Sequence, residues 1–276
     1  KLLDYIPHYY GDELVQAAKY HFDEKKKAKH IETILPENTR KGYDIREVIN
    51  DVTDDDSFFE TSAEFAINCV TGFAKIEGRS VGIIANNPGG MGGVLDCDAS
   101  DKIARHVRYC DAFNIPLVTF VDVPGFIPGP QEEQKGIIRH GAKVIYAYSE
   151  ASVPKITVIT RKAYGGAYIA MCSKHIGADF VYAWPASEIA VMGAEGAVGI
   201  LYAKELADPE KAAEVAEKEQ AYREEIMTPA IAAKRGYITE VIEPSNTRRH
   251  IAESLSFLAD KKSMDNPLKK HGNIPL

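Results

Sequence analysis

The sequence predicts an α/β protein built on a largely parallel sheet. Two copies of a strand, loop and helix unit begin about 38 residues apart, at Pro116 and at Pro154. Each copy opens with a proline followed by a β-branched run, which is typical of a buried strand whose first residue needs no ladder donor. Because repeated βα units cross over with the same right hand, their strands are expected to lie parallel in one sheet.

Length and composition agree with a globular core. The chain has 276 residues, of which 45% are hydrophobic. Its formal charge of −7 argues against nucleic acid or an anionic membrane as the main partner, since both favour clustered cations. No apolar run approaches the ~18 residues that span a bilayer, and no signal segment opens the chain, so a cytoplasmic location is expected. The first residue, Lys1, suggests a fragment of a longer protein.

The chain before the repeated units divides into a lead-in segment and the start of the core. Residues 1–60 are expected to form a helical, partly irregular lead-in, with a helix over residues 12–29, that packs on a core spanning residues 61–276. Two apolar runs within residues 71–85 flank Glu77-Gly78-Arg79, a pattern typical of a β-hairpin.

A glycine-rich loop follows the hairpin. Residues 86–93 include four glycines, and the loop is expected to be mobile or to face a ligand. A nucleotide P-loop is not predicted, because no Lys-Ser/Thr pair follows the glycines.

The first repeated unit is preceded by a helix that Asp98 or Ser100 can cap and that ends before Pro116. The strand over residues 116–122 then runs into a loop stiffened by three prolines, residues 123–130. A second helix is expected over residues 137–149.

The second unit ends in a glycine turn. Its strand, residues 154–160, leads to Tyr164-Gly165-Gly166-Ala167 and then to a helix. The amides of Gly166 and Ala167 would be first-turn donors without an intrahelical acceptor, able to serve an oxyanion. In the alternative interpretation the glycines only permit a tight strand-to-helix crossing. Ligands of such sheets bind outside the carboxyl ends of strands, where this turn and Pro124-Gly125-Phe126 would converge.

The last third of the chain is expected to be mostly helical. Short strands over residues 179–184 and 188–192 come first, and residues 193–198 form a glycine-rich helix start. Asp208-Pro209 supplies a cap and first-turn proline for a long amphipathic helix, which Pro229 interrupts and Gly236 stops. Such helices commonly make oligomer contacts.

The side chains offer little catalytic machinery. The nucleophile elbow G-x-S-x-G is absent. Glu132 and Glu133 follow the Pro-Gly loop and are candidate acid or base groups, as in a hydratase. What remains is a site of main-chain amides. No metal site is expected, because neither the cysteines nor the histidines are spaced as ligands; they are expected to be packing or surface residues: Cys69, Cys97, Cys110, Cys172, His106, His140, His175 and His250.

Several long motifs resemble the carboxyltransferase β-subunit family of biotin-dependent acyl-CoA carboxylases, of the propionyl-CoA carboxylase beta type. These motifs occupy residues 109–126, 138–143, 161–168, 183–185, 188–193 and 271–276. The similarity extends from about Leu2 to the C-terminus but corresponds only to the second half of family members, which carry two crotonase-like domains. The resemblance implies a crotonase-like spiral of repeated ββα units.

The resemblance also implies a carboxyl shuttle between biotin and an acyl-CoA. Carboxybiotin releases CO2, the ureido oxygen becomes an anion held by the amides of Gly166 and Ala167, the ureido nitrogen accepts the α-proton, and the enolate attacks CO2. Further cofactor contacts are implied for Gly125, Gly165, Tyr168 and Phe126, the last through its carbonyl to a biotin nitrogen.

Acyl selection and partners follow from the same resemblance. Ile169 stands where propionyl-type relatives carry aspartate, a substrate-binding position associated with acyl choice. The implied partners are an acyl-CoA, a biotin carboxyl carrier protein or domain, a biotin carboxylase or membrane decarboxylase subunit, and the amino-terminal half of the same protein. In the family, that half from a neighbouring subunit holds the enolate, which implies a homo-oligomer, hexameric when intact.

Other functions stay open at this point. The same motifs occur in the alpha subunit of sodium-pumping decarboxylases of the methylmalonyl-CoA or glutaconyl-CoA type and in transcarboxylases. Alternatives of other kinds are a hydratase that uses Glu132 or Glu133, and a non-catalytic module that only receives a biotin carrier.

Overall fold

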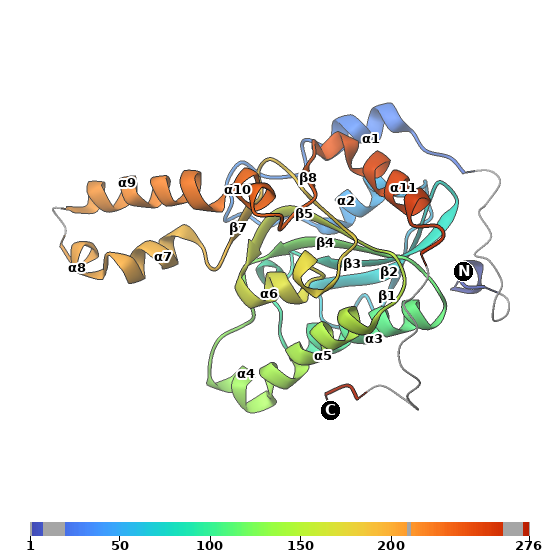
Figure 1. Cartoon of the computed structure of the whole chain (residues 1–276), viewed down its shortest axis with the longest axis horizontal. Coiled ribbons are helices and arrows are strands. Elements are labelled where there is room, and N and C mark those ends of the chain that lie inside the picture. The colour runs from blue at the N-terminus through green and yellow to red at the C-terminus, as the bar shows by residue number, and fades with distance from the viewer. Residues whose placement is uncertain (1, 8–19, 209–210, 262–272, 276) are drawn as a thin grey trace.

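The computed structural model describes residues 2–7, 20–208, 211–261 and 273–275. Its centre is an eight-stranded mixed sheet in the order β1-β2-β3-β4-β5-β6-β8, with β7 paired to β5 (Figure 1). β1 to β3 are antiparallel neighbours, and every pairing from β3 onward is parallel. The strands are β1 (Phe59–Thr61), β2 (Cys69–Ile76), β3 (Arg79–Asn86), β4 (Leu117–Val123), β5 (Lys155–Tyr164), β6 (Phe180–Ala183), β7 (Glu188–Ala190) and β8 (Glu240–Val241).

Helices cover both faces of the sheet. One apolar core lies between the sheet and α3, α5 and α6, and the other lies between the sheet and α1, α2 and α11. The helices are α1 (Glu24–Ile31), α2 (Ile45–Val52), α3 (Cys97–Ala112), α4 (Pro130–Lys135), α5 (Ile137–Glu150), α6 (Gly165–Ala170), α7 (Ala194–Leu201), α8 (Ala203–Leu206), α9 (Ala212–Tyr222), α10 (Pro229–Lys234) and α11 (Thr247–Phe257). None of them, within the described ranges, is long and apolar enough to cross a membrane.

The α/β prediction is confirmed, and the paired parallel strands β4 and β5 are those expected from the two proline-led runs. The strands alternate their side chains between the two cores: Ile84 and Val121 face α3 and α5, whereas Ile83 and Phe120 face α2. Because both faces of these strands are buried, they read in sequence as continuous apolar runs.

The expected β-hairpin is confirmed as β2 and β3. Glu77 and Gly78 both have positive φ angles, 52° and 77°, as a two-residue turn of this kind requires. Asp54 holds the turn, because its carboxylate accepts hydrogen bonds from the Glu77 and Gly78 amides at 3.0 and 2.8 Å.

Some local expectations are corrected. The N-cap of α3 is Asp96, whose side chain accepts from the Ala99 amide at 2.8 Å, and not Asp98 or Ser100. Near the chain start, α1 begins at Glu24, and residues 12–19 of the expected helix lie outside the described part, as does Pro209.

The glycine-rich loop after β3 is packed against its neighbours instead of standing free. A Cβ on Gly90 would lie 2.4 Å from the Ile67 carbonyl oxygen, and one on Gly93 would lie 2.6 Å from that of Asp122. Glycine is therefore required at these two positions because backbones approach closely there.

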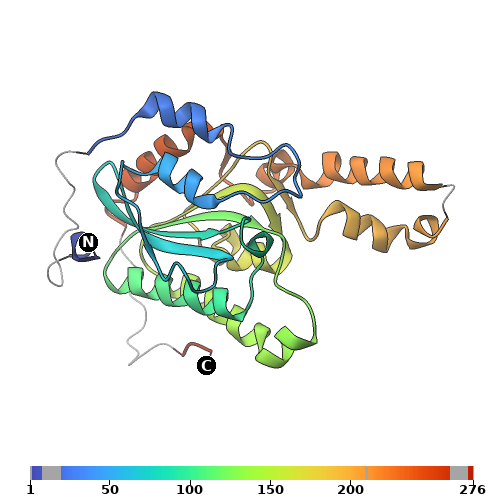
Figure 2. The same cartoon turned by 180° about the vertical axis from the view of Figure 1, so that it is seen from behind.

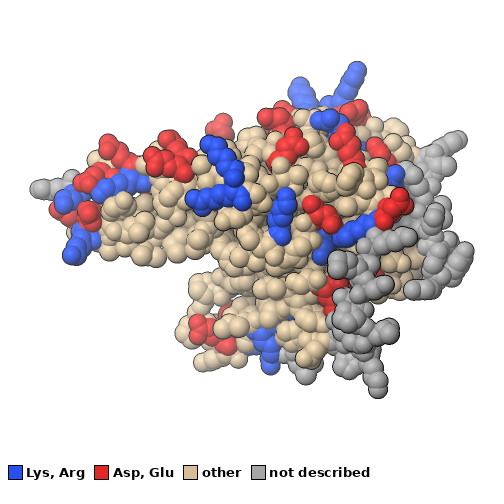
Figure 3. Space-filling model, viewed as in Figure 1, with Lys and Arg blue, Asp and Glu red and all other residues tan. Residues whose placement is uncertain are grey.

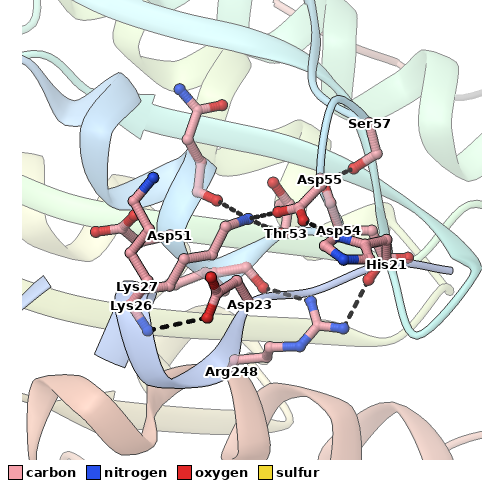
Figure 4. Close-up of polar contacts among 12 residues, drawn as sticks. His21, Asp23, Lys26, Lys27, Asp51, Thr53, Asp54, Asp55, Ser57 and Arg248 are labelled. Carbon is pink, nitrogen blue, oxygen red and sulfur yellow. Dashed lines mark hydrogen bonds and ion pairs between the residues drawn. The ribbon is translucent and has the colours of Figure 1, made fainter. Parts of the chain in front are cut away.

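The lead-in segment is attached to the core by buried and half-buried polar groups (Figure 4). Within the lead-in itself, Lys27 of α1 donates to the Thr53 carbonyl at 2.9 Å. Arg248 of α11 donates to Asp54 Oδ1 at 2.6 Å, and its guanidinium lies 3.8 Å from the centroid of the Phe22 ring. Strand β1 spans the boundary expected at residue 60, and the division into lead-in and core stays a prediction.

A helical arm, formed by α7, α8 and α9, projects from the body of the molecule (Figures 1 and 2). A small separate core of Tyr164, Ala194 and Met227, with Ala190 and Tyr222 packed against it, joins the base of the arm to the end of β5. The arm therefore starts directly beside the glycine turn.

Candidate functional site

The carboxyl ends of β4 and β5 place the two predicted loops side by side. Val123 of β4 pairs with Ala163 of β5, so the chain leaves both strands at the same edge of the sheet. The Gly125 and Phe126 loop and the glycine turn converge there, as the sequence predicts.

The glycine turn presents unpaired amides. Tyr164 is the N-cap of α6 and contributes no side-chain capping bond. Gly165, Gly166 and Ala167 are the first three helical residues, and their N–H groups lack an intrahelical acceptor. Gly166 is exposed, and a Cβ built on it meets no atom within 4 Å. The space beside Gly166 is therefore open to an anion, whereas Ala167 is buried.

Gly165 and Gly166 are glycines for different structural reasons. Gly165 has a φ of +59°, and a Cβ there would lie 2.8 Å from the carbonyl oxygen of Val191. The interpretation as a tight crossing therefore holds for Gly165. It does not explain Gly166, which has free space around it.

Phe126 offers a carbonyl that the fold does not use. Leu95 forms a bridge with Phe126: its amide donates to the Gly125 carbonyl at 3.0 Å, and its carbonyl accepts from Ile127 at 2.8 Å. In such a parallel bridge the N–H and C=O of Phe126 itself point away from Leu95. Among the described residues, no hydrogen bond is assigned to either group. Gly125, by contrast, has its carbonyl engaged.

The Phe126 ring packs closely against a glycine of α5. A Cβ on Gly141 of α5 would lie 3.0 Å from two carbon atoms of the Phe126 ring edge. Sequence reasoning missed this contact, although an isolated glycine in an apolar helix stripe is a signal of close approach.

A buried ion pair lies directly beneath the two loops. Arg161 Nε donates to Asp122 Oδ2 at 2.8 Å, and the Lys162 amide donates to Asp122 Oδ1 at 3.2 Å. Arg161 also donates to the Lys41 carbonyl at 2.9 Å, and its guanidinium lies 5.0 Å from the centroid of the Tyr43 ring. Burial raises the pKa of Asp122, and Arg161 and the Lys162 amide oppose that rise.

The remaining predicted contacts lie further along α6. Tyr168 is buried in the core, its pKa is raised to about 12 by burial, and its hydroxyl has no hydrogen-bond partner among the described residues. Ile169 is half-buried and packs against the same core. The turn thus contributes amides, and these two side chains fill the space behind it.

The glutamates considered as acid or base are not arranged for that role. Glu132 is buried, accepts from the Cys97 amide at 3.4 Å and from Lys135 Nζ at 2.7 Å, and the Lys135 bond holds its pKa below the ordinary value. Glu133 is exposed on α4. The geometry therefore gives no support to a hydratase.

The histidine and cysteine side chains do not gather into a metal centre in the described ranges, where no group of three or more His, Cys, Asp or Glu residues could hold an ion. All four cysteines are buried thiols. His106 is buried at 2.9 Å from the Gly72 carbonyl, so it is a packing residue.

The mixed sheet with amide donors at the carboxyl ends of its parallel strands defines a crotonase-like fold of the carboxyltransferase class. Residues 1–274 match the Carboxyl transferase domain, and the chain belongs to this family. The expected resemblance is thereby confirmed.

Individual relatives agree with the family. The chain is 52% identical over 246 residues to a propionyl-CoA carboxylase beta chain of Cereibacter sphaeroides, covering 89% of this chain and 48% of the relative. It is 54% identical over 254 residues to a methylmalonyl-CoA decarboxylase subunit alpha of Veillonella parvula, covering 92% and 48%. A transcarboxylase 12S structure, a hexamer with hydrolysed methylmalonyl-coenzyme A bound, superposes with a TM-score of 0.91 at 50% identity, covering 100% of this chain and 52% of that one. The chain therefore spans about half the length of these relatives.

Proposed function

We propose that this chain is the biotin-facing half of a carboxyltransferase that moves a carboxyl group between carboxybiotin and the α carbon of an acyl-CoA. The observation that carries the proposal is the pair of first-turn amides at Gly166, which is exposed, and at Ala167, at the same edge of the sheet as the Phe126 carbonyl. Two donors and one acceptor at one edge match a ureido group, whose oxygen accepts hydrogen bonds and whose nitrogen donates one.

Carboxybiotin, when bound, supplies the carboxyl group and a basic ureido nitrogen. The amides of Gly166 and Ala167 stabilise negative charge on the ureido oxygen as the carboxyl group leaves. The Phe126 carbonyl orients the ring through the other ureido nitrogen. Gly125 and Gly165 shape the two loops, and Tyr168 supports α6 from behind. Because the amides are fixed by the sheet ends, their orientation costs no reorganisation during the reaction.

The site on this chain is only half of what the reaction needs. Gly166 is exposed, and two cavities, one of about 810 Å³ between α1, α2 and α11 and another of about 430 Å³ against α3, are lined by other residues. An enolate from the acyl-CoA needs its own donors and a dry environment. We propose that the amino-terminal half of a neighbouring subunit supplies both.

The helical arm is the proposed place for that neighbour. It carries exposed apolar side chains, and Figure 3 shows its charged groups along one edge and at its tip. A patch of this kind on a soluble chain marks an interaction site. The exposed apolar residues on the arm and at its base are Val191, Ile200, Leu201, Leu206 and Ile226. The proposed assembly is a homo-oligomer, hexameric when intact, that works in the cytoplasm with a biotin carrier and with a biotin carboxylase or a membrane decarboxylase subunit.

Ile169 is proposed to influence which acyl chain is accepted, because it stands two residues after Ala167 and is half-buried. Carboxylase, decarboxylase and transcarboxylase share the half-reaction at this site. The proposal therefore covers all three enzyme types, which run this half-reaction in one direction or the other.

The test uses the intact protein with a carboxylated acyl-CoA and free biotin as the carboxyl acceptor. We expect loss of the carboxyl group to depend on biotin, and residues 1–276 alone to show negligible acyl-CoA turnover. Binding of a biotin carrier without any turnover by the intact protein would instead indicate a docking module. Hydration of an enoyl-CoA without biotin would indicate a hydratase.

A further inference from the structure

Tyr164 stands at the joint between the glycine turn and the helical arm. It is the last residue of β5 and the N-cap of α6. Its ring is buried and packs with Ala194 of α7 and Met227. The fit is close, since a Cβ on Gly193 would lie 3.4 Å from the Tyr164 ring. Any movement of this ring therefore moves the residue from which the turn starts.

The Tyr164 hydroxyl is held by a carboxylate. It donates a hydrogen bond to Glu188 Oε2, and Glu188 lies in β7 directly opposite Lys162 of β5. Burial raises the pKa of Tyr164, and Glu188 adds to that rise, so the phenol keeps its proton and stays a donor at neutral pH. The bond fixes the ring at its far end, while β5 fixes it at the backbone.

Glu188 is in turn connected to the arm. Arg223 Nε lies 3.8 Å from Glu188 Oε1, and Arg223 Nη2 lies 2.7 Å from Glu219 Oε1 of α9. Arg223 begins a π-helical segment, Arg223–Met227, which ends with the Met227 side chain that packs near the Tyr164 ring. Segments of this kind inside α-helices occur frequently at functional sites.

The main chain at the base of the arm also touches the turn. The carbonyl oxygen of Val191, just after β7, faces Gly165 so closely that a Cβ would lie 2.8 Å from it. Residues 188–191 thus contact the turn twice, once through this carbonyl and once through Glu188. The mechanism proposed above uses neither contact.

We propose that Glu188 is a positioning residue for the amides of Gly166 and Ala167, acting through Tyr164, and that Arg223 links this network to the helical arm. The inference rests on the proposed function of those amides. A carboxylate that anchors the N-cap residue limits the backbone angles from which the following N–H groups start. Oxyanion donors act only when aimed at the developing charge, so a small tilt of the turn weakens both donors together.

A purely structural role predicts a different result. If Glu188 only stabilised the base of the arm, its loss would lower the free energy of unfolding and disturb acyl-CoA binding, while carboxyl transfer from bound substrate would keep its rate. A positioning role lowers kcat and leaves the KM for acyl-CoA near its original value.

The experiment compares four variants of the intact oligomer in biotin-dependent carboxyl transfer. Glu188→Ala removes the acceptor, Tyr164→Phe removes the donor, and Glu188→Gln keeps an oxygen that can accept the bond. Glu214→Gln is the matched control, because Glu214 forms an ion pair with Lys218 at 2.7 Å on the same arm without reaching the turn. We expect kcat to fall up to about 100-fold in the first two variants, as for other small misplacements of reacting groups.

The expected pattern also includes rescue and a readout that does not need activity. Glu188→Gln should retain most of the kcat, and Glu214→Gln should match the original protein. Amide hydrogen exchange in residues 164–170 should speed up in Glu188→Ala and Tyr164→Phe. Normal kcat together with unchanged exchange in a folded Tyr164→Phe protein, or equal losses in Glu188→Gln and Glu188→Ala, would overturn the inference.

The exchange measurement separates this inference from the proposed function. If the amides of Gly166 and Ala167 have no role in carboxyl transfer, kcat is unaffected but exchange in residues 164–170 still responds to Glu188→Ala. If exchange is unchanged, Glu188 does not hold the turn, whatever the reaction is.

Discussion

Arg161 Nε lies 2.8 Å from Asp122 Oδ2, and this single ion pair joins the ends of the two strands from which both loops of the site depart. The side chains are 5% and 1% exposed, so water screens the pair very little. The pair holds β4 and β5 together at the point where their register shifts, between Val121 and Val123. We therefore expect the Arg161–Asp122 ion pair to fix the relative position of the two loops.

Replacing Asp122 by alanine should be strongly destabilising, because the Arg161 charge would stay buried without its partner. Removal of one member of a buried pair costs about 3 to 5 kcal/mol. Urea unfolding followed by circular dichroism measures the loss. Glu253→Ala is the control, since Glu253 and Arg249 are both mostly exposed and 3.8 Å apart, and such pairs contribute about 0 to 1 kcal/mol. Equal losses of unfolding free energy in the two variants would show that the buried pair stabilises the fold no more than the exposed pair does.

The sequence was informative where local pattern decides structure. β4 was predicted because Pro116 precedes an apolar, β-branched run, and the turn at Gly165 was predicted because glycines follow a strand and precede apolar helix formers. β5 extends past its predicted end, to Tyr164, because its last residues pair with β7. That pairing joins residues about 26 positions apart, as Lys162 and Glu188 show, and no local propensity reveals it.

The site was less predictable because its supports are distant in sequence. Leu95 pairs with Phe126, and Gly141 makes room for the Phe126 ring; neither contact follows from periodicity. Glycines also have two structural roles, close backbone approach and open space for a ligand, which a sequence does not distinguish. Gly90 and Gly93 permit close backbone approach, although their loop reads as mobile, whereas Gly166 leaves open space. The amides themselves were predictable because a helix start always leaves donors unpaired.

Gly141→Ala should reduce carboxyl transfer by displacing Phe126. The new methyl group would lie 3.0 Å from the ring edge, so the ring must shift. We expect the Phe126 backbone carbonyl to shift with it. The expected loss in rate is up to about 100-fold. Steady-state kinetics of the intact protein with free biotin measures it, and the KM for biotin should rise.

The control for Gly141→Ala is Ala142→Gly, at the next position of α5. This change costs about 1 kcal/mol of helix stability and adds no atom near Phe126. We expect lower stability with normal turnover. Normal turnover in Gly141→Ala as well would show that the Phe126 ring can shift without affecting carboxyl transfer.

His106 should make stability depend on pH. Burial lowers its pKa to about 4, against 6.5 for an unhindered histidine. Between these values the unfolded chain binds a proton that the folded chain does not, so stability rises with pH from about 4 to 6.5 and is constant above. The contribution over this window is about 3 kcal/mol.

His106→Gln tests that window, because glutamine can still donate to the Gly72 carbonyl but does not titrate. The free energy of unfolding, measured in urea at a series of pH values, should depend less steeply on pH in the variant than in the original protein. Parallel curves between pH 4 and 6.5 would mean that His106 binds its proton equally well in both states.

Ala167→Pro is the sharpest test of the amide site. Ala167 is the third residue of α6, where the N–H has no helical acceptor, so proline removes a donor without breaking a helical bond. The preceding residue, Gly166, has no Cβ to collide with the proline ring and has free space beside it. The variant should therefore fold. Loss of one oxyanion donor lowers the rate by about 10² to 10³, roughly 2.7 to 4 kcal/mol, so carboxyl transfer should fall by that order.

Ala167→Gly keeps the donor and should keep most of the activity, which separates loss of the N–H from loss of the methyl group. Circular dichroism and melting temperature establish that each variant is folded; normal turnover by a folded Ala167→Pro protein would show that the Ala167 amide does not stabilise the ureido oxygen.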